Sequence, residues 1–157
     1  MRASTSTLVL LATLVSLGTS SLVAQTPDHE AAYEVVTTLS DGMRTRDTTA
    51  MRATFVPNAS MQSLTATGVR FETIDGWIES VGRAPAGTVL DERLANAVVH
   101  VDGDLANVWV DYWFYVGDRF SHCGVDAFFL ARRDGAWRIF SVVDTRRREG
   151  CAPAPSR

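Results

Sequence analysis

Residues 99–143 have the sequence VHVDGDLANVWVDYWFYVGDRFSHCGVDAFFLARRDGAWRIFSVV, and their pattern is the clearest indication of the fold. The apolar runs in this stretch are rich in Val, Trp, Tyr and Phe, and they are separated by Asp-Gly or Gly-Asp pairs at 102–103, 117–118 and 134–135. Such runs favour β-strands, and such pairs between them are typical of tight hairpin turns. The sequence therefore predicts four antiparallel strands in a meander, over residues 88–101, 104–116, 119–133 and 136–146.

The residues before this meander have a helical period. Thr26 followed by Pro27 is typical of a helix start, and apolar residues then recur every three or four positions, which predicts a helix over 27–44. We expect a short second helix after Asp47, a strand at 56–64, and a helix at 72–82 whose buried stripe begins with Phe71. Helices followed by an antiparallel sheet indicate an α+β fold, here one domain over residues 25–151.

Composition and motifs exclude several kinds of function. The chain has 157 residues, a formal net charge of −3 and no lysine. An acidic chain is a poor general partner for nucleic acid, and without lysine it has neither Schiff-base chemistry nor a phosphate-binding loop lysine. His29, His100 and His122 are scattered, and no G-x-S-x-G motif is present. We therefore expect no metal site, no cofactor and no covalent nucleophile.

The N-terminus has the layout of an export signal. Residues 1–24, MRASTSTLVLLATLVSLGTSSLVA, place one arginine before an interrupted apolar run that ends in small residues. This pattern predicts a cleaved signal peptide; the alternative is an uncleaved anchor, for which the run is short compared with the roughly 20 apolar residues of a membrane span. We expect a secreted or periplasmic protein with no stable membrane span after cleavage.

Export affects the interpretation of the two cysteines, Cys123 and Cys151. In an oxidising compartment they are able to form a disulfide; the alternative is two unrelated thiols. The disulfide is favoured because Cys151 lies in a polar C-terminal segment with little else to anchor it. We expect residues 152–157 beyond it to be disordered.

Hairpin registers predict which side chains share a face of the sheet. If the turns at 102–103 and 117–118 are regular, Trp113 lies opposite His122, and Trp109 lies opposite both Asp126 and Asn96. This register collects polar and tryptophan side chains on one face: Glu92, Asn96, Trp109, Asp111, Trp113, His122 and Asp126. That face is either the solvent side of the sheet or the wall of a small-molecule pocket, since pockets combine aromatic walls with a few polar groups.

The closing stretch SHCGVDAFFLARRDGAWRIFSVVDTRRREGC, residues 121–151, resembles the nuclear transport factor 2-like superfamily, in particular its SnoaL-like or putative lumazine-binding branch. The resemblance covers roughly residues 28–151. It implies a cone-shaped domain in which a curved antiparallel sheet packs against N-terminal helices around a cavity. It also implies a frequent homodimer.

In catalytic relatives a carboxylate inside the cone moves a proton, sometimes with a histidine partner. The resemblance thus suggests Asp126 or Asp111 as the base and His122 as its partner. The substrate contacts would be Trp109, Trp113, Asn96 and Glu92.

Two functions follow from these expectations. The first is the binding of a small apolar or aromatic molecule by an exported protein, with a cofactor-independent isomerase, dehydratase or cyclase type of reaction as an extension. The second is a non-catalytic dimeric interaction module. Structural roles also remain open: His122 as a hydrogen-bonded strand residue, and Asp126 as a partner of arginine or backbone donors. We expect Asp144 and the arginines of 146–148 to form a solvated ion-pair patch.

Overall fold

A computed structural model describes residues 27–156 of the chain, so the predicted signal peptide lies outside the described residues. The described part contains the helices α1 (Pro27–Thr45), α2 (Thr48–Ala53) and α3 (Ile74–Gly82). Its strands are β1 (Phe55–Thr65), β2 (Gly68–Thr73), β3 (Leu90–Asp102), β4 (Leu105–Val116), β5 (Arg119–Arg133) and β6 (Ala136–Thr145). None of the helices within residues 27–156 combines the length and the apolar character needed to cross a bilayer.

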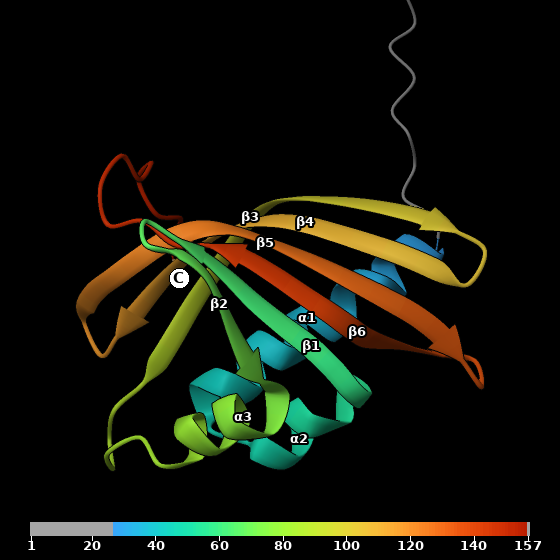
Figure 1. Cartoon of the computed structure of the whole chain (residues 1–157), viewed down its shortest axis with the longest axis horizontal. Helices are drawn as coiled ribbons and strands as arrows, with labels where there is room; N and C mark the ends of the chain where they lie inside the picture. The colour runs from blue at the N-terminus through green and yellow to red at the C-terminus, as the bar shows by residue number, and fades with distance from the viewer. Residues whose placement is uncertain (1–26, 157) are drawn as a thin grey trace, which may run out of the picture.

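The strands form one curved, open sheet in the order β2-β1-β6-β5-β4-β3 (Figure 1). The predicted meander is confirmed, because β3, β4, β5 and β6 pair in sequence and antiparallel. The sheet is mixed rather than wholly antiparallel, since β1 pairs with β6 in parallel. After β1 the chain forms β2 and α3 and then crosses to the opposite edge of the sheet, where it forms β3. The next strands, β4, β5 and β6, follow one another back across the sheet, so that β6 lies beside β1.

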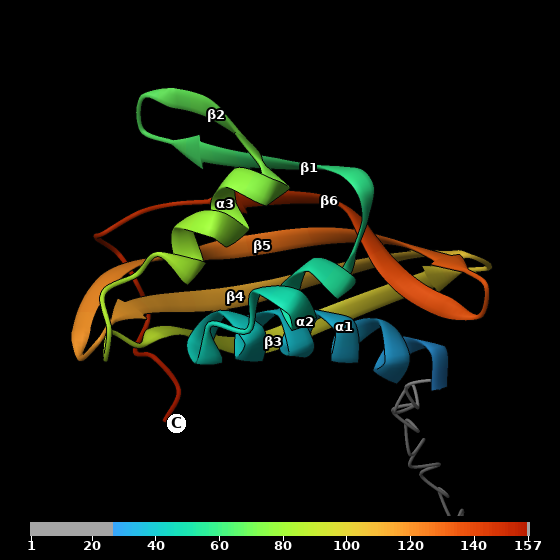
Figure 2. The same cartoon turned by 90° about the horizontal axis from the view of Figure 1, so that it is seen from below.

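The helices all lie on the concave side of the sheet, as Figure 2 shows. The main core lies between them and the inner face of the strands, where α1 contributes Val36 and Leu39, α3 contributes Ile78, and the sheet contributes Val108 and Ile139. Burial of these side chains holds the helices against the sheet. The predicted α+β class, with helices packed on a curved sheet, is confirmed.

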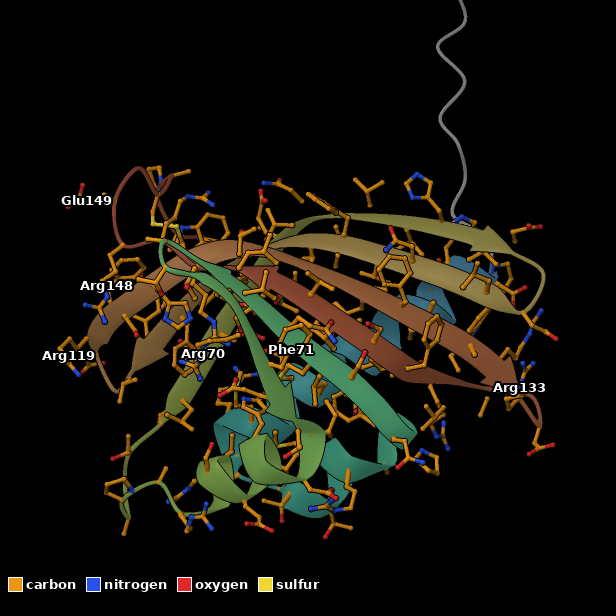
Figure 3. The ribbon with its side chains drawn as sticks, in the orientation of Figure 1. Arg70, Phe71, Arg119, Arg133, Arg148 and Glu149 are labelled. Carbon is orange, nitrogen blue, oxygen red and sulfur yellow. A yellow bond between two sulfur atoms is a disulfide. The ribbon has the colours of Figure 1, made fainter. Side chains whose placement is uncertain are left out.

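Strand β2 corrects the prediction of a helix from residue 72. Residues 68–73 pair with β1, and α3 begins only at Ile74, after the Thr73 hydroxyl has accepted a hydrogen bond of 3.1 Å from the Gly76 amide. Phe71, which we expected in the buried stripe of a helix, is paired with Gln62 at the edge of the sheet and is 77% exposed (Figure 3). The apolar side chain of Phe71 satisfied the helical period without belonging to the helix.

The C-terminal segment is tied to the convex side of the sheet. Cys123 and Cys151 form the predicted disulfide. Beyond it, the Ala152 carbonyl accepts a 2.7 Å hydrogen bond from the Trp113 indole, and the Pro155 carbonyl accepts a longer one of 3.4 Å from Arg93. Two backbone carbonyls of the segment that we expected to be disordered therefore accept hydrogen bonds from the sheet, one of them from the buried Trp113 indole, whose N–H requires an acceptor.

Candidate functional site

The site is determined by an irregularity in the β4–β5 hairpin. A regular two-residue turn would place Trp113 opposite His122, but the pairing shifts by one residue after Tyr115↔Phe120, and His122 lies opposite Phe114. Ser121 is the extra residue of this β-bulge. Downstream of a bulge every side chain changes its cross-strand partner, so Asp126 pairs with Val110 instead of Trp109.

A second irregularity occurs between β3 and β4. Ala95 pairs with Asp111 and Val98 with Trp109, which leaves Asn96 in a bulge with a positive φ of 54°. The Asn96 amide donates a 2.9 Å hydrogen bond to the Asp111 carboxylate. The sequence prediction that these side chains share a face with His122 and Asp126 is wrong. Trp109 is 51% exposed on the convex face, away from the helices.

Trp113 also lies on the convex face, where the C-terminal segment covers it. The two bulges thus divide the predicted cluster. Trp109, Trp113, Asp111 and Asn96 are on the outer side of the sheet, whereas Glu92, His122 and Asp126 are on the inner side.

The inner side contains a cavity of about 90 Å³ between α1, α3 and the sheet. About 10–15 Å³ of such volume accommodates one water, so the cavity has room for several waters or one compact molecule. Most of its wall is apolar, with Leu39 and Met43 from α1 and Trp77 from α3. Its polar wall consists of Glu92 on β3, Tyr112 on β4, His122 and Asp126 on β5, Asp144 near the end of β6, and Arg146 directly after β6.

Asp126 is the most unusual of these groups. It is 5% exposed, it faces the cavity, and among residues 27–156 its carboxyl has no hydrogen-bonding partner. Burial raises the pKa of Asp126 well above its ordinary value, and the nearby charges of Glu92 and Asp144 raise it further, against the opposing effect of Arg146. The carboxyl therefore retains its proton more readily than a surface aspartate.

The pKa of Glu92 is raised as well. Burial, together with the charge of Asp144, raises its pKa from 4.5 to about 7, although Arg146 opposes the shift. A group of this kind is close to half protonated at neutral pH. It is therefore able to donate or accept a proton under physiological conditions.

Asp144 and Arg146 form a pair beside these acids. The Arg146 Nε donates a 2.6 Å hydrogen bond to Asp144 Oδ2, and its terminal nitrogen lies 3.9 Å from the Glu72 carboxylate. The Tyr112 hydroxyl lies 3.2 Å from Asp144 Oδ2 and 2.9 Å from the Thr145 carbonyl.

The expected solvated patch is wrong for this pair, because Asp144 is only 5% exposed and Arg146 lines the cavity. Sequence reasoning did not place either residue in the site. The two-residue period of the last strand could have indicated the position of Asp144. Side chains two residues apart on a strand lie on the same face, and Val142 is buried, so Asp144 lies on the buried face as well.

A glycine allows the strands to approach each other at this point. A β-carbon on Gly124 would lie 1.7 Å from the Thr145 carbonyl oxygen and 2.8 Å from the Tyr112 ring. No side chain fits there, so glycine is required for the end of β6 to lie against β5. This contact brings Asp144 and Arg146 to the cavity.

His122 lies at the end of the polar wall. Its Nδ1 is 2.9 Å from the Ser121 hydroxyl, and its ring contacts the rings of Tyr112 and Phe114 at centroid distances of 5.6 and 5.2 Å. Burial lowers its pKa to about 4, and the Arg146 charge adds to the shift. The imidazole is therefore neutral at physiological pH, and within the described residues it has no hydrogen bond to Asp126 or Glu92.

The polar groups of the cavity are able to form hydrogen bonds with a bound molecule and to exchange protons with it. Two carboxyl groups with raised pKa values face an apolar cavity, beside a neutral imidazole and a charge pair. Among residues 27–156, no group of His, Cys, Asp and Glu side chains has an arrangement that would hold a metal ion.

Comparison with known proteins agrees with this architecture. The family model described as putative lumazine-binding matches residues 27–143. A search of curated proteins found no match.

Solved structures share the fold. A nuclear transport factor 2-like protein of unknown function from Silicibacter pomeroyi is 25% identical, with a TM-score of 0.62 over 79% of this chain and 100% of that one. A putative dehydratase of the same fold from Streptomyces avermitilis is 16% identical, with a TM-score of 0.61 over 76% and 95%. The β subunit of a putative aromatic-ring-hydroxylating dioxygenase from Novosphingobium aromaticivorans is 12% identical, with a TM-score of 0.64 over 80% and 92%.

Proposed function

This chain belongs to the family described as putative lumazine-binding, of the nuclear transport factor 2-like superfamily, and we propose that it binds a compact small molecule in the cavity between the helices and the sheet. The observation that carries the proposal is Asp126, a buried carboxyl that faces the cavity without a hydrogen-bonding partner in the described chain. A ligand that donates a hydrogen bond to this carboxyl would gain affinity if it replaced the water that the cavity has room to hold.

The cavity restricts the size of the ligand. Its volume of about 90 Å³ suits a molecule with a single ring or a short branched chain. Trp77, Phe114 and Phe128 provide apolar contacts for the body of such a molecule, while Glu92 and Asp126 select its polar end.

A second candidate function is proton transfer on the bound molecule. It is supported by Glu92, whose pKa of about 7 suits a general acid or base at neutral pH. In this reaction Glu92 or Asp126 would remove a proton from a carbon or oxygen of the substrate and return it elsewhere. The Tyr112 hydroxyl lies within hydrogen-bonding distance of Asp144 and the Thr145 carbonyl, so its role would be to hold Asp144 in place.

The setting proposed for this activity is an oxidising compartment outside the cytoplasm. The Cys123–Cys151 disulfide supports it, since such bonds persist in secreted and periplasmic proteins. We also propose a homodimer that pairs through the convex face of the sheet, where large apolar side chains are exposed: Val98, Trp109, Phe129 and Phe140. The alternative of a non-catalytic interaction module would use this face and leave the cavity empty.

The test is a thermal-shift screen of compact metabolites against the purified protein and Asp126→Asn. The variant keeps the shape of the protonated carboxyl, and Glu34→Gln, an exposed position on α1, is the matched control. We expect compounds that raise the melting temperature of wild type and of the control but not of Asp126→Asn. If every stabilising compound acts equally on all three proteins, binding does not involve this site and the proposal fails.

A further inference from the structure

We propose that the cavity binds a small organic cation, an ammonium group carried on a compact hydrocarbon body. This inference rests on the proposed function, because it names the chemical class of the ligand for the same cavity.

The first support is the balance of charged groups around the cavity. Glu92, Asp126 and Asp144 line it, and Glu72 lies nearby. The guanidinium of Arg146 is the only cationic side chain among the residues that line the described cavity. Its Nε forms a salt bridge of 2.6 Å with Asp144 Oδ2, and one of its terminal nitrogens lies 3.9 Å from a carboxylate oxygen of Glu72. Among residues 27–156, Glu92 and Asp126 therefore have no salt bridge, although the Arg146 charge still acts on both.

The second support is the environment of Asp126, which does not depend on the number of acidic groups around the cavity. Asp126 is more than nine-tenths buried, it faces the cavity, and its oxygens accept no hydrogen bond from residues 27–156. An ionised buried carboxylate requires both donors and a positive charge to be stable, and without them the group retains its proton, as the raised pKa of Asp126 indicates. An ammonium group supplies both at once, whereas a neutral donor supplies only the first.

The apolar wall determines the rest of the ligand. Trp77, Tyr112 and Phe114 line the cavity, and aromatic rings favour a neighbouring cation. Met43 and Leu39 offer only hydrocarbon and sulfur contacts, which suit a carbon skeleton. A bare metal ion does not fit this wall, since the residues described by the structure contain no group of His, Cys, Asp and Glu suited to a metal.

Other titratable groups around the cavity do not oppose a cation. On β5, burial lowers the pKa of His122 to about 4, so the imidazole carries no charge at neutral pH. On β4, burial raises the pKa of Tyr112, so its hydroxyl stays neutral as well. The cavity residues from α1, α3 and β1 are all uncharged: Leu39, Met43, Trp77 and Met61. Arg148 acts on His122 from the segment after β6 and is itself exposed.

The ionisation of Glu92 predicts the pH dependence. A cation binds best when a facing carboxyl is ionised, and burial raises the pKa of Glu92 to about 7. Below that pH, binding must release one proton, so the dissociation constant should increase about tenfold for each pH unit. A neutral ligand that accepts a hydrogen bond from the protonated acid would show the opposite trend.

The experiment compares benzylamine with benzyl alcohol, which has a similar shape and no charge. Both are titrated into the purified protein by calorimetry between about pH 5 and about pH 8, in buffers with different ionisation enthalpies, so that proton release is measured directly. Benzylamine stays protonated throughout this range. We expect it to bind at least about tenfold more tightly than the alcohol at the upper end, with release of about one proton near the lower end.

Variants locate the effect. Asp126→Asn should weaken benzylamine by at least about tenfold and change the alcohol by less than about twofold. Glu34→Gln should change neither, and Glu92→Gln should reduce the proton release to the part that comes from Asp126, whose pKa burial also raises. Circular dichroism and a melting curve establish that each variant is folded.

The outcomes separate the two proposals. If the alcohol binds as tightly as the amine and Asp126→Asn weakens both, the organic cation is the wrong ligand class while small-molecule binding in the cavity stands. The same conclusion holds if neither probe binds but other compounds protect wild type and not Asp126→Asn. If no compound of any class binds, both proposals fail.

Discussion

Replacing Glu92 with glutamine should remove a pH-dependent loss of stability. The pKa of Glu92 in the folded protein is about 7, compared with an ordinary value of 4.5. Between these values the native state binds the proton more tightly than the unfolded chain, so stability is greatest below the lower value and falls as the pH rises toward 7. Glutamine does not titrate, so the variant lacks this loss.

The magnitude follows from the pKa shift. One pH unit corresponds to about 1.4 kcal/mol, which would give about 3 kcal/mol for the whole interval. Glu92 keeps some contact with solvent, which screens its charge, so we expect ~1–3 kcal/mol. The Glu92 charge also raises the pKa of Asp126, so the pKa of Asp126 is lower in Glu92→Gln. The stability of the variant therefore falls less as the pH rises, which adds to the expected difference from wild type.

The assay is urea unfolding followed by tryptophan fluorescence at several values from about pH 4 to about pH 8. The pKa of His122 is lowered to about 4, so its contribution to stability is lost as the pH falls from 6.5 toward that value. Because this trend opposes that of Glu92, the wild-type curve alone is not diagnostic. The difference between Glu92→Gln and wild type isolates the carboxyl.

We expect this difference to shift in favour of the variant as the pH rises. Glu34→Gln, at an exposed site, should run parallel to wild type. A Glu92→Gln difference that is constant over the whole range, or that shifts in favour of wild type, would contradict the raised pKa of Glu92.

Three further changes test the structure around the site. Gly124→Ala should destabilise the protein by at least ~2 kcal/mol in urea unfolding, because a β-carbon would lie 1.7 Å from the Thr145 carbonyl oxygen, and a loss under about 0.5 kcal/mol would contradict that contact. Cys123→Ser combined with Cys151→Ser should cost about 3–4 kcal/mol, since the disulfide closes a loop with a sequence separation of 28; an unchanged unfolding midpoint would mean that the bond does not constrain the unfolded chain. Trp109→Asp should convert the proposed dimer to a monomer in sedimentation velocity while circular dichroism shows the chain still folded, whereas a dimer that persists would exclude the convex face as its interface.

The fold was predictable because the turns and the hydrophobic periods agree. Asp-Gly pairs at 102–103 and 134–135 separate long apolar runs, and the described strands β3, β4, β5 and β6 lie where these signals place them. Strand β2 was missed because it is short, lies at the edge and leads directly into α3. A helical period that begins with exposed Phe71 cannot be distinguished from the true helix that starts three residues later.

The candidate site was predictable only in part because register depends on single residues. Ser121 and Asn96 each add one residue to a strand, and each bulge moves the side chains that follow to the other face relative to the neighbouring strand. Asn96 carries a weak signal, since asparagine tolerates a positive φ, but Ser121 carries none. The burial of Val108, Val110 and Tyr112 decides the register, and this burial depends on tertiary packing.

Methionine methyl groups report directly on whether a small molecule binds inside the cavity. Met43 and Met61 line the cavity, whereas Met51 is buried against Gly42 outside it. A methyl NMR spectrum of the protein labelled at methionine is recorded while compact compounds are added. We predict that compounds which bind shift the Met43 and Met61 signals and leave Met51 in place. If bound compounds leave Met43 and Met61 unchanged, or if none of a broad set binds, binding inside the cavity is contradicted.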